Sequence, residues 1–241
     1  MFILLAVLAA AVVMICMEIR MPGRSWPQVA GWWSRAAAFN GIQAVLVFVA
    51  GLALDERMLE ARPWSADRLG VTAGALLGYL VSTFVYYWWH RWRHEVPLLW
   101  RWLHQIHHSA QRLEILTSFY KHPLEIGINC VLTSIVLYLV VGLGPAAASG
   151  AVLLAGLGEL FYHWNFKTPH WVGYIFQRPE SHCVHHEEGI HHYNYSDLPL
   201  WDILFGTFNN PREWRGRCGL GSANESRVVA MLVGVDVTAV K

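Results

Sequence analysis

The segment VTAGALLGYLVSTFVYYWWHRWRH, residues 71–94, is an apolar run that ends in aromatic residues and two histidines. At about 1.5 Å per residue, a helix over 71–89 spans roughly 28 Å, which is close to the thickness of a bilayer core. The aromatic residues at 86–89 would lie at one membrane surface, where Tyr and Trp are enriched. We therefore predict a membrane helix that places His90 and His94 at that surface, on one helix face.

Three further apolar runs cover residues 2–17, 37–54 and 128–161. The third is interrupted by GLGP at 142–145, which predicts a turn between two helices. Only 15% of the residues are charged and 55% are hydrophobic, whereas a soluble domain carries about a quarter charged residues. We therefore predict an all-α integral membrane bundle of about four to five membrane helices.

Basic residues indicate how the bundle is oriented. They are frequent in 91–121 and again in 167–227, whereas the loop at 55–69 mixes acidic and basic residues. The positive-inside rule then places the two basic segments in the cytoplasm, and the 55–69 loop and the N-terminus outside. The run at 128–161 crosses twice, so the chain returns to the same face. We expect three parts: N-terminal membrane helices and loops (1–70), a membrane domain that carries the histidines (71–210) and a C-terminal tail (211–241).

Composition and missing motifs exclude several classes of protein. The net charge is +1, so the overall charge indicates no nucleic acid or other polyanionic partner. The four cysteines are scattered and form no CxxC, so we expect free thiols and no iron–sulfur module of the chain's own. No GxGxxG is present to indicate a flavin or nicotinamide domain. A site that needs electrons would therefore take them from another protein.

Three clusters hold eight of the 13 histidines: HRWRH at 90–94, HQIHH at 104–108 and HCVHH at 182–186. On a helix, spacings of three and four let each cluster direct its imidazoles toward one point. Neutral imidazole is the commonest protein ligand of transition metals, and eight exceed what one tetrahedral zinc ion can use. We therefore predict a cytoplasmic cap with two metal ions, each with about four or five ligands. The eight residues are His90, His94, His104, His107, His108, His182, His185 and His186.

Further polar residues near the clusters are candidates for the same site. His163 ends the second arm of the 128–161 hairpin, and Glu159 lies four residues before it, where it could accept the second ring N–H. His191 or His192, just beyond the last cluster, could complete a coordination sphere. Isolated histidines are usually solvated, and we expect this of His122 and His170.

The three clusters, in this order and spacing, resemble the histidine motifs of the fatty acid hydroxylase/sterol desaturase superfamily of membrane di-iron enzymes. The resemblance covers about 75–210 and extends to the segments at 122–125, 163–165 and 194–195 and to WDILFGT at 201–207. Ser196 departs from the pattern, because the family often has glycine there. The resemblance implies metal ligation by the eight clustered histidines, with His163 and the pair 191–192 as additions. Asp202 and Glu159 would then support the ligands from behind.

The resemblance also implies the reaction. Members use O2 and two reducing equivalents to hydroxylate or desaturate unactivated C–H bonds of lipids, and two Fe ions carry that chemistry. The substrate would be a sterol, fatty acyl, carotenoid or alkyl-ether lipid from the bilayer. The electrons would come from a separate cytochrome b5-, ferredoxin- or rubredoxin-like donor with its reductase.

Two other functions fit parts of the pattern less well. A membrane metal-binding or transport protein would hold its ligands near the middle of spanning helices, whereas these histidines lie at helix ends. A metal-dependent hydrolase would normally include carboxylate ligands, and no HExxH occurs in the chain.

Overall fold

The computed structural model describes residues 2–239, and that part of the chain is helical, with one isolated β-bridge between Glu187 and Cys218. Two of its helical segments, η2 and η4, are π-helical. The elements in chain order are α1 (Phe2–Arg20), α2 (Trp32–Glu60), η1 (Asp67–Leu69), α3 (Gly70–Glu95), α4 (Pro97–Leu99), η2 (Trp100–His104), α5 (Gln105–Ser109), η3 (Ile115–Thr117), α6 (Pro123–Ser134), η4 (Ile135–Val140), α7 (Pro145–His163), η5 (His170–Tyr174), α8 (Pro179–His185), α9 (Pro199–Leu204), α10 (Ser222–Glu225) and α11 (Val228–Leu232).

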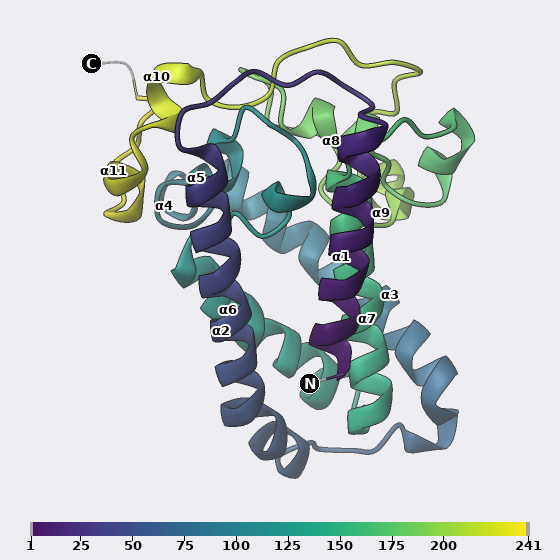
Figure 1. Ribbon diagram of the computed structural model, residues 1–241. Helices are drawn as coiled ribbons and strands as arrows, with labels where there is room; N and C mark the ends of the chain where they lie inside the picture. Colours follow the sequence, from purple (N-terminus) through teal and green to yellow (C-terminus); the bar gives the residue numbers. More distant parts are fainter. Residues whose placement is uncertain (1, 240–241) are drawn as a thin grey trace.

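Long helices form the membrane part of the molecule, and short helices gather at one of its ends (Figure 1). Within the described residues, four segments are long and apolar enough to cross a membrane: Trp32–Glu60, Asp67–Glu95, Pro123–Val140 and Pro145–His163. Helix α1 lies along α7, and α2 lies along α6. This arrangement confirms the predicted all-α membrane bundle.

Small residues allow α3 and α7 to pack closely in the centre of the bundle. A Cβ atom at Gly78 would lie 2.6 Å from a methyl group of Leu143 and 3.1 Å from Ala151, so a larger residue would push the helices apart. A Cβ at Gly74 would lie 3.0 Å from Ala147. Close approach of backbones through small residues is how membrane helices gain packing energy, because lipid gives them little hydrophobic drive to associate.

Two loops meet at the end of the bundle opposite the histidines. The amide of Ala66 donates to the carbonyl of Gly142 at 2.8 Å, which joins the loop after α2 to the turn between η4 and α7. Gly142 has a φ of 77°, a left-handed conformation that favours glycine. The predicted turn at 142–145 is therefore present, and both ends of the hairpin return to the histidine side (Figure 1).

The arms of this hairpin are longer than the sequence pattern indicated. They cover Pro123–Val140 and Pro145–His163, whereas the apolar run begins only at 128. The first arm begins earlier because Glu125, a residue that would oppose membrane insertion, is buried in an ion pair with Arg93 of α3. Because its charge is paired, Glu125 lies within α6, and the helix begins at Pro123 instead of at residue 128.

The C-terminal tail packs on the histidine side of the bundle. Met231 and Val237 are buried in a core with Ile106 and Trp32. The side chain of Gln105 donates to the carbonyl of Val235 at 2.8 Å. These contacts tie the tail to the helix that carries the second histidine cluster. The division of the chain at 70 and 210 stays a prediction.

Candidate metal centre

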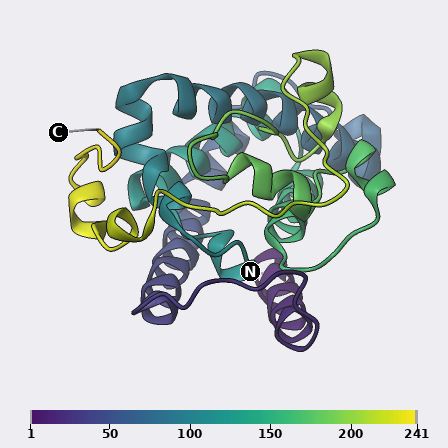
Figure 2. The same cartoon turned by 90° about the horizontal axis from the view of Figure 1, so that it is seen from above.

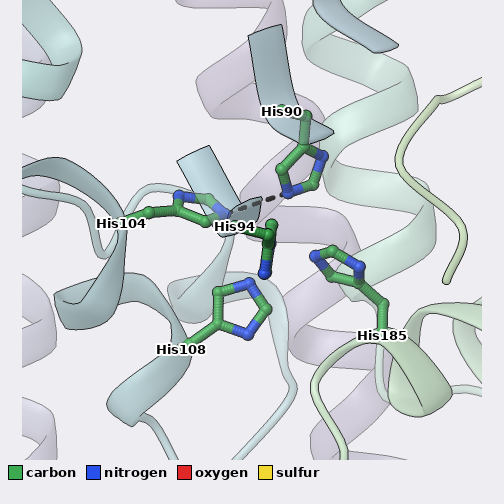
Figure 3. Close-up of side chains that lie close together, drawn as sticks. All are labelled: His90, His94, His104, His108 and His185. Atoms are coloured by element: carbon green, nitrogen blue, oxygen red, sulfur yellow. Dashed lines mark hydrogen bonds between the residues drawn. The ribbon is translucent and has the colours of Figure 1, made fainter. Parts of the chain in front are cut away.

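Nine histidines form two adjacent groups at the end of the bundle. In each group, one nitrogen of every ring lies within 4.8 Å of the others, a spacing suited to a metal ion. Figure 3 shows the larger group, in which rings from α3, the α5 region and α8 point toward one another. The five-histidine group contains His90, His94, His104, His108 and His185, and the four-histidine group contains His107, His163, His182 and His186.

The two HxxHH clusters divide their histidines between the groups in reciprocal ways. In the cluster at 104–108 the first and last residues enter the five-histidine group, and His107 enters the other. In the cluster at 182–186 the first and last residues enter the four-histidine group, and His185 enters the other. Residues four apart share a helix face, whereas adjacent residues point in different directions. Each HxxHH cluster therefore serves both groups, which couples them into one centre.

Protein oxygen atoms hold three rings of the five-histidine group from behind. The Nδ1 atom of His90 lies 2.7 Å from the carbonyl of Tyr195, and Nδ1 of His185 lies 2.6 Å from the carbonyl of Tyr193. A carbonyl can only accept, so each Nδ1 carries the proton and each Nε2 keeps its lone pair. This is the arrangement that orients a metal-binding imidazole.

Glu125 performs the same task for the third ring. Its Oε1 lies 3.2 Å from Nδ1 of His104, and the guanidinium of Arg93 forms an ion pair with the same carboxylate. All three side chains are buried. Sequence reasoning placed 122–125 in a family motif but gave Glu125 no role, although an acidic residue near the start of an apolar helix was a usable signal.

Asp202 lies one step farther from the histidines. Its carboxylate accepts from the amides of Tyr195 and Ser196 at 2.8 and 3.0 Å and from the hydroxyl of Thr207 at 2.7 Å. These bonds fix the backbone whose carbonyl contacts His90. Burial raises the pKa of Asp202 to about 7. Asp202 would therefore support His90 indirectly, by fixing the backbone of Tyr195, whose carbonyl contacts the ring.

In the four-histidine group, the Nε2 atoms face one another. His163 Nε2 lies 3.3 Å from His107 Nε2 and 3.1 Å from His182 Nε2, and His182 Nε2 lies 3.1 Å from His186 Nε2. Nδ1 of His163 lies 2.8 Å from the carbonyl of Glu159, and the Glu159 carboxylate accepts from Lys121 at 2.9 Å. The backbone carbonyl of Glu159 is thus the nearer acceptor for this ring, while its carboxylate lies 3.4 Å from the same nitrogen, and the supporting role predicted for the carboxylate stays a prediction.

The other three rings of that group are held less firmly. The Nδ1 atoms of His107, His182 and His186 are buried and have no hydrogen-bond partner within residues 2–239. The hydrogen-bond partners of these three rings lie on the inner side of the group, where the Nε2 atoms converge.

Burial keeps the rings of both groups in the form that binds metals. It lowers the pKa of His104, His107 and His182 well below the usual value, and neighbouring cationic or imidazole groups lower it further. For His185, burial lowers the pKa to about 3. The rings are therefore neutral at neutral pH, and a neutral imidazole has one nitrogen free to bind a metal ion. One nitrogen of every ring in each group lies within 4.8 Å of the others, so the residues fit two metal ions.

The two histidines after the last cluster have different positions. Nδ1 of His191 lies 3.1 Å from Nδ1 of His108, so this ring lies behind a member of the five-histidine group. His191 has a φ of 47°, an unusual conformation for a residue other than glycine. His192 is exposed and contacts the carbonyl of Ile190. The structure brings His191 to the edge of the centre and leaves His192 outside both groups.

The expectation that His122 is a solvated surface residue is wrong. The ring is buried, its Nδ1 accepts from the amide of Leu124 at 3.0 Å, and it caps the N-terminus of α6. Its Nε2 contacts the carbonyl of Leu232 at 3.2 Å. His122 precedes the proline that begins α6, and its ring supplies an acceptor for the backbone amide of Leu124, which has no partner within the helix. His170 is half-buried and contacts the carbonyl of Asn210.

Comparison with known proteins places this site in a family. The profile of the family described as fatty acid hydroxylase matches residues 75–207, which include both histidine groups. Ornithine lipid hydroxylase OlsE of Rhizobium tropici is 33% identical over 150 residues, which cover 60% of this chain and 44% of that protein. Alkylglycerol monooxygenase of Homo sapiens is 33% identical over 162 residues, 63% of this chain and 33% of that protein.

A third relative has another activity in its name. Very-long-chain aldehyde decarbonylase GL1-4 of Oryza sativa subsp. indica is 28% identical over 197 residues, 73% of this chain and 29% of that protein. The chain therefore spans less than half the length of each of these relatives. No solved structure matches the chain significantly.

Proposed function

This chain belongs to the fatty acid hydroxylase family, and we propose that it inserts an oxygen atom from O2 into a C–H bond of a bilayer lipid. It is a multi-pass membrane protein with histidine clusters typical of the di-metal sites of this family. The observation that carries the proposal is the convergence of nine histidines, seven of them buried and the other two partly buried, in two coupled groups at the end of the membrane helices.

The proposed ligands are the nine histidines of the two groups. They would hold two iron ions, which supply the oxidising power that an unactivated C–H bond requires. The overall reaction consumes one O2, two electrons and two protons and gives one hydroxylated lipid and one water. His191 remains a proposed addition behind His108, and we do not propose His192 as a ligand.

The chain's own residues prepare the site for this reaction. The carbonyls of Tyr193 and Tyr195 and the carboxylate of Glu125 keep the outer ring nitrogens oriented, so the inner nitrogens stay available. Burial of the rings excludes water, which would otherwise quench a reactive oxidant. The aromatic ring of Tyr162 packs against His182, with 4.5 Å between the ring centroids.

The substrate we favour is an aliphatic chain of a polar lipid. The names of two relatives refer to lipids with such chains, an ornithine lipid and an alkylglycerol. The site lies at the ends of membrane helices, where a lipid chain reaches it from the bilayer. Desaturation of the same chain is the alternative outcome, because it needs the same oxidant and the same electron supply. We further propose that the centre faces the cytoplasm, on the strength of the basic segments around it.

A membrane metal transporter is the competing function, and the geometry disfavours it. Both histidine groups lie together at one end of the helices, and a transport path would need polar ligands along the spans. Three rings of the five-histidine group are also held by carbonyl and carboxylate partners, which opposes the release of a transported ion.

The deciding experiment measures oxygen incorporation. The protein is loaded anaerobically with Fe(II) in nanodiscs of mixed polar lipids, reduced with dithionite, freed of the excess reductant and then exposed to 18O2, and the lipids are analysed by mass spectrometry. We expect about two irons per chain and a lipid product heavier by one 18O atom. A desaturated lipid without 18O would replace hydroxylation by desaturation. Iron binding without any O2-dependent lipid product would overturn the proposal.

A further inference from the structure

An exposed basic segment crosses the face of the molecule that is farthest from the loops at 61–66 and 141–144 (Figure 2). It reads REWRGR at residues 212–217. The side chains of Arg215 and Arg217 are 85% and 86% exposed. This face points away from the membrane helices, so it contacts water and soluble proteins.

A cavity of about 720 Å³ opens beside this segment. Trp26 and Trp214 lie on its lining with ring centroids 5.9 Å apart, and Arg24, Arg215 and Arg217 surround them. Tryptophan and arginine are the residues that most often dominate binding energy at protein interfaces. The composition of this hollow is therefore that of a protein-binding site.

The floor of the cavity is close to the four-histidine group. Cys218 lines the cavity, and the next residue, Gly219, donates its amide to the carbonyl of His186 at 3.0 Å. Glu187, the residue after His186, pairs with Cys218 and accepts from the indole of Trp214 at 2.8 Å. One hydrogen bond thus separates the cavity floor from a proposed metal ligand. Electron transfer through protein weakens steeply with distance, so this is a favourable entry point.

The lining of the cavity carries an excess of positive charge. We define the arginine face as this cavity together with the exposed segment REWRGR beside it. Three arginines, Arg24, Arg215 and Arg217, line the cavity, and one carboxylate, Glu188, lies among the lining residues. Glu188 pairs with Arg217 at 3.3 Å, and Arg215 pairs with Glu213 at 2.7 Å. The lining by itself therefore has two positive charges in excess.

We propose that the arginine face docks the electron donor, a small electron-transfer protein whose surface is acidic around its redox centre. The inference rests on the proposed function, because that reaction needs two electrons that no motif of this chain supplies. Charge complementarity would steer the donor to the cavity. The two tryptophans would then form the contact, and the electrons would pass from the cavity floor to His186. Lipids would approach the centre from the opposite side.

Charge reversal separates donor docking from catalysis. Arg215→Glu/Arg217→Glu is compared with Arg57→Glu/Arg68→Glu, two exposed arginines at the other end of the bundle. In dithionite-driven turnover, the protein is reduced with dithionite, freed of the excess and then exposed to O2 for a single turnover. In donor-driven turnover, a reduced protein donor supplies the electrons, with a [2Fe–2S] ferredoxin and the soluble domain of cytochrome b5 as acidic probes. We expect the first variant to lose roughly tenfold or more in kcat/KM for the protein donor at low ionic strength. Its dithionite-driven turnover should equal that of the wild type and the control.

The milder variant Arg215→Gln/Arg217→Gln should show a smaller loss, and added salt should slow the donor-driven wild-type reaction. Equal donor-driven rates in wild type and the charge-reversal variant would overturn the proposal, and so would failure of both acidic probes to reduce the wild type. A loss that follows the content of anionic lipid instead of the donor concentration would assign the arginine face to membrane binding. Absence of dithionite-driven turnover in the wild type would instead overturn the proposed function itself.

Discussion

The two histidine groups differ in how the protein holds them. In the five-histidine group, His90, His104 and His185 each have an oxygen acceptor behind the ring. In the four-histidine group only His163 has one, and three outer nitrogens lack a partner in the described residues. The protein therefore orients more rings of the first group through their outer nitrogens than of the second. We therefore expect the two groups to differ in their affinity for a metal ion and in the rate at which the bound ion exchanges.

The sharpest comparison comes from neighbouring residues that serve different groups. His107→Ala and His108→Ala remove adjacent rings, the first from the four-histidine group and the second from the five-histidine group. We expect each variant to lose at least about 100-fold in turnover, because both ions are needed for one reaction. Metal analysis should show one ion lost per variant. His192→Ala, which removes an exposed ring, is the control. Loss of both ions in both variants would show that the groups do not bind independently.

Acid should destabilise the metal-free protein strongly. Burial lowers the pKa of His185 to about 3 and those of His104 and His107 well below the unfolded value of about 6.5. As the pH falls below about 6.5, the unfolded chain gains protons that the folded chain does not bind. Each such histidine then costs about 1.4 kcal/mol of stability per pH unit. Chemical denaturation of the apoprotein in micelles at pH 7.5 and 5.5 measures this, and equal stability at both pH values would contradict it.

Glu125→Gln should affect the five-histidine group alone. The amide is a weaker acceptor for His104 and leaves Arg93 buried without its counter-charge. We expect the affinity of one ion to fall by about 10- to 100-fold, measured by competition with a chelator, while the other ion is unchanged. Glu60→Gln, an exposed change at the end of α2, serves as the matched control. If the affinities for both ions fell equally, the oxygen acceptors behind the rings of the five-histidine group would not account for a difference in metal affinity between the groups.

Asp202→Asn should act on the same group but more weakly. The variant keeps one acceptor oxygen, but its amide group would face backbone N–H donors of Tyr195 and Ser196. The carbonyl that orients His90 would shift as a result. We expect the affinity of the five-histidine group for its metal ion to fall roughly tenfold. A larger loss from the four-histidine group would place the role of Asp202 elsewhere.

The smallest effect is expected from His191. It contacts the outer nitrogen of His108, so His191→Ala removes a support and leaves every ring of the two groups in place. Turnover should fall a few-fold, about 1 kcal/mol or less, by analogy with loss of one neutral hydrogen bond. Loss of a whole ion in His191→Ala, measured by metal analysis, would instead make this residue a ligand.

The membrane helices were predictable because their signal is local. An apolar run of suitable length, ended by aromatic residues or by GLGP, needs no information from the rest of the chain. The start of α6 at Pro123 was missed because Glu125 gains its partner, Arg93, from a helix 32 residues earlier. Sequence position also could not show that the tail returns to pack on α5, since Met231 and Ile106 are far apart in the chain.

At the site, the sequence by itself determined which side chains would be available. The i, i+3, i+4 spacing puts imidazoles on adjacent helix faces whatever the rest of the chain does, and helical geometry alone explains this. Only the tertiary structure decided that each HxxHH cluster divides between two groups, that His163 joins one of them and that His192 stays outside. It also decided which rings have oxygen atoms behind them. These features depend on where helix ends and loops from distant parts of the chain meet, and no local spacing encodes that.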